Sequence, residues 1–445
     1  MSWDAFASSM IQAPWQLPAQ GAQLASGLFS AGGAGERAGA ASRTGGATQT
    51  LTETAGQLAL GGYLALQELG KEFAANPLSP LLDAGRLLAD SVSGCRPCQG
   101  GLLQLREYAN KSEVFVLVLG VPKILDLPSH PPFPSLKEIV DRAYSRPPRP
   151  IVWLVEGSGK YYTDTFWAVG QTPRGILSLR NLQGITPKSR LMLNAGLGLS
   201  LAVEQGKGVS PASPLDEIRR MIEQFLALVR SNATPGSQGA ALESLGLVTR
   251  SGIFTGVTDP LQMVEVVSPE LRQMDAQAWD YFWHGAGRSL YFDPVNFVPC
   301  HTSIWQAIEM LVRESPEGIA RLSSTAGYAW AVTLVNLPQP AIMGAFLERY
   351  ADRLPNPEAF SYGVMTSIMM RFDTTPDDPS ILPFCEYRPE CGDPAVWERF
   401  VSRPCRTGLK EFYPVLKRHN QLGQIFRFQD LGRLVEQLKR KGGRS

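Results

Sequence analysis

Short segments rich in glycine and alanine recur along the chain after Pro150, and this recurrence restricts the fold more than any other feature of the sequence. Side chains this small let neighbouring backbones approach closely. Looser copies surround Gly327 and Gly363, at intervals that suit one helix pair per structural unit. The clearest copy is a Gly-x-Gly-x-Ser-Leu pattern, found at residues 196–201 and again at 285–290.

Amphipathic segments alternate with these small-residue segments. In residues 213–230, Ser213 is predicted to cap a helix and Pro214 to occupy its first position. Residues 302–313 repeat this design. We therefore expect inner, glycine-rich helices and outer helices that face water. The predicted buried stripes are Leu215, Ile218, Ile222, Phe225 and Val229 in the first segment and Ile304, Ile308 and Leu311 in the second.

This alternation predicts a mainly α fold of repeated helix pairs, either an open α-solenoid or a closed α/α toroid, with a few short strands. The strands are expected at "EVFVLVLGVPKIL" and "IVWLVEGSG", which are alternatively the starts of buried helices. Three regions are predicted: an Ala/Gly-rich, partly helical arm at 1–105, a helical repeat body at 106–400 and a basic helical tail at 401–445. The first boundary is placed between residues 100 and 112, where the composition changes.

Composition argues against several classes of function. The chain has 445 residues, with 42 basic and 41 acidic side chains, so its net charge of +1 provides no field for nucleic acid. No apolar run approaches the roughly 20 residues that a membrane span requires. The first residues lack the pattern of a secretory signal, so we expect a cytoplasmic protein. We expect no cofactor; the oligomeric state is left open.

The cysteines suggest no standard site. Cys95 and Cys98 have the C-x-x-C spacing of dithiols and zinc half-sites, but no second such pair exists, so their role is left open. Zinc binding by Cys385, Cys391 and Cys405 with His419 matches no standard spacing. We therefore predict no metal site.

The segment "YFWHGAGRSLYFDPVNFVPCH", residues 281–301, holds the strongest candidates for chemistry. His284 and Arg288 are four residues apart and share one helix face, and Asp293 follows. A fixed cation disfavours the charged imidazole, which leaves a base or donor near neutral pH. These three residues are the catalytic candidates. The ligand-binding candidates are Glu156, Trp283, Gly287, Tyr291, Phe292 and His301.

Structural interpretations compete with each of these assignments. In the structural interpretation, Arg288 caps backbone carbonyls or pairs with Asp293, and His284 fills a polar gap in an aromatic core. Glu156 and Lys160, if helical, form an i, i+4 pair. A phosphate loop at "EGSGKYY" is rejected, because Leu154 and Tyr161 replace its required glycine and hydroxyl.

Four blocks in order, "VEGSGKYYTDTFWA", "LMLNAGLGLSLA", "SLGLVTRSGIFTG" and "FWHGAGRSLYF", resemble the conserved blocks of the UnbL-type family of unknown function, which is encoded in enediyne biosynthetic clusters and elsewhere in bacteria. The resemblance covers roughly residues 110 to 345. Residues 285–292 look like its Gly-x-Gly-Arg-Ala-Leu-Trp-Phe block and Glu156-Gly157 like its Glu-Gly-Ala block. Residues 249–252 depart from its Asp-Gly-Tyr-Gly segment.

The resemblance implies a place near polyketide-derived polyene metabolism but supplies no reaction. We accordingly expect an accessory protein that binds a long apolar or polyene intermediate in a helical groove, with His284 and Arg288 at its polar end. Two alternatives are kept. One is a cofactor-independent lyase, isomerase or cyclase that uses His284 as base. The other is a scaffold for a polyketide synthase or carrier protein, docked through the N-terminal arm or the basic tail.

Overall fold

The computed structural model describes residues 97–146, 150–252, 260–293, 303–389 and 393–442. All regular structure in these ranges is helical, so the mainly α prediction is confirmed, and the few predicted strands do not occur there. The two β-like segments belong to helices instead. Periodicity does not separate a buried strand from a buried helix, and here the length of the apolar runs favours the helix. The helices concerned are α5 (Pro97–Leu119), α6 (Val121–Ile124) and α8 (Ile151–Ala168).

The chain divides into two compact units, and only residues 97–116 of the first are described. They form most of α5, in which Glu107 and Lys111 are buried one turn apart as an ion pair of 3.0 Å. Helix α5 runs without a break through residues 100–112, so the boundary expected there falls inside a helix. The arm predicted before residue 97, including its expected helices, lies outside the described residues.

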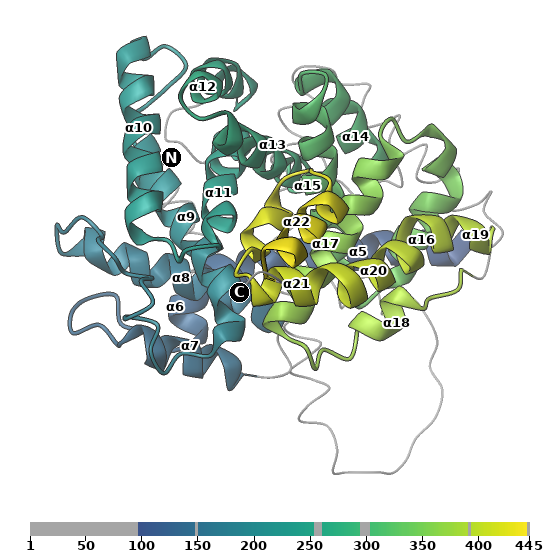
Figure 1. Cartoon of the computed structure of the whole chain (residues 1–445), viewed down its shortest axis with the longest axis horizontal. Helices are drawn as coiled ribbons and strands as arrows, with labels where there is room; N and C mark the ends of the chain where they lie inside the picture. The colour runs from purple at the N-terminus through teal and green to yellow at the C-terminus, as the bar shows by residue number, and fades with distance from the viewer. Residues whose placement is uncertain (1–96, 147–149, 253–259, 294–302, 390–392, 443–445) are drawn as a thin grey trace, which may run out of the picture. The chain divides into compact units, whose positions relative to one another are not determined.

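Six largely buried helices form the centre of the second unit (Figure 1). Each packs on the next along the chain: α8 on α9, α9 on α11, α11 on α13, α13 on α15 and α15 on α17. Their small residues allow this, because larger side chains would hold the helix axes farther apart. The bounds of the other five are α9 (Arg190–Gly206), α11 (Gln238–Ser251), α13 (Ala276–Tyr291), α15 (Ile319–Val335) and α17 (Pro357–Thr374).

Glycine contacts show how these neighbours are oriented. Gly159 of α8 faces the backbone of Leu193 in α9, whereas Gly196 of α9 faces the backbone of Glu156 in α8. Residue numbers rise along one helix as they fall along the other, so the two helices run antiparallel. Two further pairs are antiparallel by the same argument. Helices α11 and α13 are joined by the contacts of Gly246 with Phe282 and of Gly285 with Glu243. Helices α13 and α15 are joined by the contacts of Gly287 with Ser324 and of Gly327 with His284.

The Gly-x-Gly pattern has a direct structural cause. Two positions two residues apart lie about 200° apart around an α-helix, on nearly opposite sides. In α13, Gly285 therefore faces Glu243 of α11 while Gly287 faces Ser324 of α15, and a Cβ at either would collide with the neighbour's carbonyl oxygen. Residues 196–198 place α9 between α8 and α11 in the same way. The duplicated motif thus marks a helix with close neighbours on both sides.

Amphipathic helices separate the central ones along the chain. Four of the five predicted stripe residues of α10 (Leu215–Asn232) are buried, but Leu215 is 46% exposed. Pro214, rather than Ser213, is the residue that precedes the first turn. The alternation agrees with the predicted order of inner and outer helices, while regular repeats in a solenoid or toroid stay a prediction. The remaining outer helices are α7 (Leu136–Tyr144), α12 (Pro260–Met274), α14 (Ser303–Glu314) and α16 (Pro340–Tyr350).

Helical segments recur in the C-terminal region up to residue 442, with irregular stretches at 419–421 and 427–430. Residues 394–418 form consecutive helical segments, two of which, Glu398–Ser402 and Gly408–Phe412, are π-helical. The short 3₁₀ helix η7 (Leu422–Phe426) follows and is buried, and α22 (Leu431–Gly442) ends the described chain. Among the residues that the structure describes, no helix combines the length and apolarity needed to cross a bilayer.

Candidate functional site

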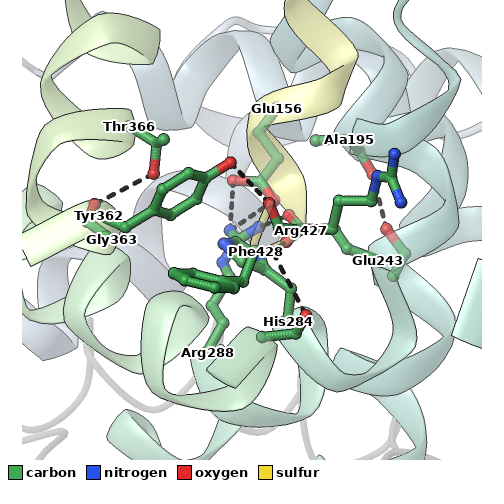
Figure 2. Close-up of polar contacts among 12 residues, drawn as sticks. Glu156, Ala195, Glu243, His284, Arg288, Tyr362, Gly363, Thr366, Arg427 and Phe428 are labelled. Carbon is green, nitrogen blue, oxygen red and sulfur yellow. Dashed lines mark hydrogen bonds and ion pairs between the residues drawn. The ribbon is translucent and has the colours of Figure 1, made fainter. Parts of the chain in front are cut away.

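A cluster of four buried side chains lies among the central helices. Arg288 of α13 contacts Glu156 of α8 and Glu243 of α11 (Figure 2). Its Nη2 donates to both oxygens of Glu156 at 2.8 and 3.0 Å, and its Nη1 donates to Oε1 of Glu243 at 2.7 Å. The three side chains are 4%, 2% and 0% exposed. One guanidinium therefore bridges two carboxylates from two other helices, away from solvent.

His284 completes the cluster from one turn earlier in α13. Its Nδ1 lies 2.7 Å from Oε2 of Glu243, and its side chain is fully buried. With Glu243 ionised opposite the permanently charged Arg288, both of its oxygens are acceptors, so Nδ1 of His284 carries a proton and donates to Oε2. Nε2 of the neutral imidazole is then a hydrogen-bond acceptor, the arrangement by which a carboxylate orients a histidine base.

The glycine contacts hold these side chains in place. Gly285, between His284 and Arg288 in sequence, packs on the carbonyl oxygen of Glu243, and Gly196 packs on that of Glu156. The carbonyl of His284 itself contacts Gly327. Every member of the cluster except Arg288 thus sits at a point of backbone contact between two helices. Close helix contacts and buried charges therefore occur together in this part of the bundle.

Aromatic rings border the cluster. The Arg288 guanidinium carbon lies 4.8 Å from the ring centroid of Trp330 and 6.0 Å from that of Trp153, within range of cation–π attraction. The His284 ring meets Trp330 and Phe426 nearly edge to face, at centroid separations of 6.3 and 6.0 Å. Phe426 comes from η7 rather than from a central helix. The surroundings of the charged groups are therefore apolar on the His284 side.

Three polar atoms at this border have no hydrogen-bond partner among the described residues: His284 Nε2, Arg288 Nε and Trp330 Nε1. Leaving one such atom unsatisfied in a protein interior costs about 1–3 kcal/mol. In native structures, buried groups of this kind are satisfied by water, an ion or a ligand, or have a functional role. The cluster therefore combines well-paired charges with neighbouring donors and acceptors that the protein itself does not use.

Burial and pairing act in opposite directions on the ionisation of the cluster. Burial raises the pKa of Glu156, and the neighbouring Arg288 only partly reverses this effect. Burial alone would lower the pKa of Arg288, but Glu156 and Glu243 raise it above the ordinary value, so its charge is retained. With His284 neutral, two carboxylates and one guanidinium give a net charge of −1. One added proton on Glu156, whose pKa burial raises, makes the buried cluster neutral.

The structure brings three of the predicted site residues together, His284, Arg288 and Glu156. Asp293, predicted with them, instead contacts Arg250 at 2.9 Å. The proposed helical pair of Glu156 with Lys160 is wrong, since Lys160 contacts Asp164 at 2.6 Å and Glu156 contacts Arg288.

The remaining candidates have packing roles or lie outside the described residues. Gly287 is the contact with α15. Tyr291 is buried and accepts a hydrogen bond from Asn336 at 2.7 Å, with the half-buried Phe292 edge-on against it. Trp283 packs edge-on against Trp279 and Phe282. His301 is not among the described residues.

Glu243 and the three rings were missed by the sequence argument. The sequence did contain a signal for Glu243, which is the only acidic residue of α11. The residues within one turn on either side of it are small or apolar. Glu156 stands in α8 in the same kind of surroundings. Nothing in the sequence joins Trp153, Trp330 and Phe426, which are far apart along the chain.

The other constellations noted in the sequence do not form sites in the described ranges. Gly159-Lys160 lies inside α8, so a phosphate loop is excluded there. Cys385 and Cys405 are buried neighbours: a hydrogen bond with Cys405 lowers the pKa of the Cys385 thiol, while burial raises that of Cys405. Cys95 and Cys391 lie outside the described residues, which include no group of three His, Cys, Asp or Glu side chains arranged to hold a metal ion.

Comparison with known proteins adds no relative: no family model, curated protein or solved structure matches this chain. The resemblance to the UnbL-type family therefore stays a prediction from the quoted blocks.

Proposed function

We propose that this protein binds a largely apolar small molecule beside the buried glutamate–arginine–histidine cluster, with Nε2 of His284 as a hydrogen-bonding group. The observation that carries this proposal is the state of His284. Its Nδ1 is held by Glu243, while its fully buried Nε2 has no partner among the described residues. A ligand group at Nε2 would remove the cost of this unsatisfied atom. The rings of Trp330 and Phe426 supply apolar surface next to it.

Access to Nε2 in this proposal comes through movement of Phe426. This side chain packs on the His284 ring from a five-residue 3₁₀ helix, whereas Trp330, the other ring in contact, belongs to the 17-residue helix α15. Short 3₁₀ segments have poorer hydrogen-bond geometry than α-helices and shift at lower cost. Displacing one phenyl ring opens space for the flat, conjugated part of a ligand between His284 and Trp330.

The UnbL-type resemblance supports a more specific proposal. In it, the protein is a cytoplasmic accessory protein of bacterial secondary metabolism, and its ligand is a polyene intermediate of an enediyne- or polyketide-type pathway. Its partners are then a polyketide synthase or a carrier protein. The exposed basic residues in the last turn of α22, Lys439 to Lys441, are compatible with an acidic partner.

A second candidate function is a cofactor-independent lyase, isomerase or cyclase. The observation in its favour is that one guanidinium pairs with two buried carboxylates, Glu156 and Glu243, so that a proton on Glu156 makes the cluster neutral. A buried, shared proton beside an apolar surface suits general acid–base chemistry on an unsaturated ligand. In that case His284→Asn would leave ligand binding measurable but abolish deuterium uptake by the bound polyene in D₂O.

Binding is tested with all-trans retinol and retinoic acid as polyene probes. Both absorb where tryptophan emits, so a ligand beside Trp153 and Trp330 would quench the emission of the full-length protein. The matched variants are His284→Asn, whose amide replaces Nδ1 only, and His284→Gln, whose amide reaches the position of Nε2. Losing one hydrogen bond should weaken binding by about tenfold in His284→Asn and less in His284→Gln.

A purely structural role predicts the reverse order, because only His284→Asn keeps the bond to Glu243. Phe426→Ala should strengthen probe binding by removing the covering ring. Phe400→Ala, which truncates an equally buried phenylalanine elsewhere in the second unit, should leave probe binding unchanged. Absence of saturable quenching by both probes would contradict the proposed function.

A further inference from the structure

The charges around His284 restrict the chemical class of ligand that this site accepts. Arg288 is the only permanent cation of the cluster, and both of its terminal nitrogens already donate to Glu156 and Glu243. Its positive charge is therefore matched within the protein by two carboxylates. Arg288 therefore has no free charge for the carboxylate or phosphate of a ligand.

The net charge of the cluster does not attract an anion in either protonation state of Glu156. With Glu156 ionised and His284 neutral, the cluster carries −1 and repels an anion. With one proton added, it is neutral and attracts neither anion nor cation. A buried ionic group without a partner is disfavoured in both states, and the net charge of −1 adds repulsion of an anion in the first state.

The unsatisfied atoms describe the group that does fit. Arg288 Nε and Trp330 Nε1 are donors, and they have no partner among the residues described. His284 Nε2 is an acceptor when the imidazole is neutral and a donor when it is protonated. A hydroxyl group both donates one hydrogen bond and accepts others, so it satisfies His284 in either state and can accept from a neighbouring donor.

Resting on the proposed function, we infer that the ligand is a neutral, largely apolar molecule that presents a hydroxyl group to His284, and that the site discriminates against carboxylates and amines of the same carbon skeleton. The two glutamates are specificity-determining residues in this inference. They cancel the charge of Arg288 and thereby prevent it from recruiting acids.

The test compares three probes that share one polyene chain: retinol, retinoic acid and retinylamine, each titrated into the full-length protein at pH 8. We expect retinol to bind about tenfold or more tightly than either ionised analogue, as for a single mismatched polar head in a buried site. Equal affinities, or tighter binding of the acid or the amine, would overturn the inference while leaving the proposed function intact. Binding of none of the three would overturn both.

Glu156→Gln provides the second measurement, because it adds one unit of positive charge to the cluster without changing its shape. The ratio of retinoic acid affinity to retinol affinity should rise by about tenfold in this variant. The matched control is Glu314→Gln, which removes a buried carboxylate from the Arg250 pair and should leave the ratio unchanged. If Glu156→Gln does not fold, the wild-type ratio alone decides; an unchanged ratio in a folded variant contradicts the assignment of Glu156 to specificity.

Discussion

Two buried arginines of the second unit look alike in sequence but have different surroundings. Arg250 donates from Nε and Nη2 to the two oxygens of Glu314, at 2.6 and 2.9 Å, and from Nη1 to Asp293 at 2.9 Å. All three of its nitrogens are used. Arg288 is also held by two carboxylates, yet its Nε lacks a partner among the described residues, as does the neighbouring His284 Nε2.

This difference separates a structural ion pair from a candidate site. Arg250 ends α11 and ties it to the last turn of α14, with carboxylates that are 6% and 13% exposed. Arg288 of α13 contacts carboxylates from α8 and α11 and lies beside the rings of Trp153 and Trp330. Buried charge alone therefore does not indicate function. Unused donors and acceptors next to the buried charge do.

The largest expected effect comes from removing each arginine. Arg288→Met leaves two buried carboxylates without a cation and should lower the free energy of unfolding by about 3–5 kcal/mol. Arg250→Met should cost less, because the carboxylates it leaves are closer to water. Urea unfolding of both variants measures the difference. A greater loss in Arg250→Met would contradict the comparison, and adding Glu156→Gln and Glu243→Gln to Arg288→Met should recover part of its loss.

A smaller effect is expected from adding a methyl group at the helix contact beside Arg288. Gly285→Ala places a Cβ against the carbonyl oxygen of Glu243, so α11 and α13 must separate, at a cost of about 1–3 kcal/mol. The control is Gly344→Ala in the outer helix α16, where the nearest atom is Cε1 of the Tyr387 side chain at 3.1 Å. A ring can move, and alanine favours helices by up to about 1 kcal/mol, so little or no loss is expected. Thermal or urea unfolding of the two variants decides; similar losses would mean that the contact is not tight.

The smallest effect concerns pH. Burial raises the pKa of Glu156 in the folded protein, so the folded state binds a proton more tightly than the unfolded state. Its contribution to stability is therefore present below the unfolded pKa, near 4.5, and is lost as pH rises through the folded pKa. Stability should fall with rising pH in that window, by at most about 1.4 kcal/mol per pH unit for one proton.

Glu156→Gln should remove this part of the pH dependence. Urea midpoints of the wild type and the variant, measured from pH 4 upward, give the two slopes. Parallel curves would show that Glu156 titrates alike in the folded and unfolded states. They would also weaken the view that the Arg288 cluster shares a proton.

Individual residues show how far sequence reasoning reached. The i, i+4 spacing of His284 and Arg288 correctly placed them on one face of a helix, because this relation depends only on helix geometry. Asp293 was assigned to the same site but pairs with Arg250, because it follows the last turn of α13 and lies beside the last turn of α11, away from Glu243. Glu243 was missed because its distance in sequence from His284 hides a contact made by helix packing.

The sequence by itself determined the helices and their close contacts. Glycines two residues apart place small surfaces on opposite sides of a helix, and this relation is local, so it is written in the order of the residues. Only the tertiary structure decided which side chains meet at those contacts. The register between the helices places Glu156 and Glu243 against Arg288 and leaves Nε2 of His284 without a partner in the described chain. This register depends on packing between residues that are far apart in the sequence, so the sequence alone does not reveal it.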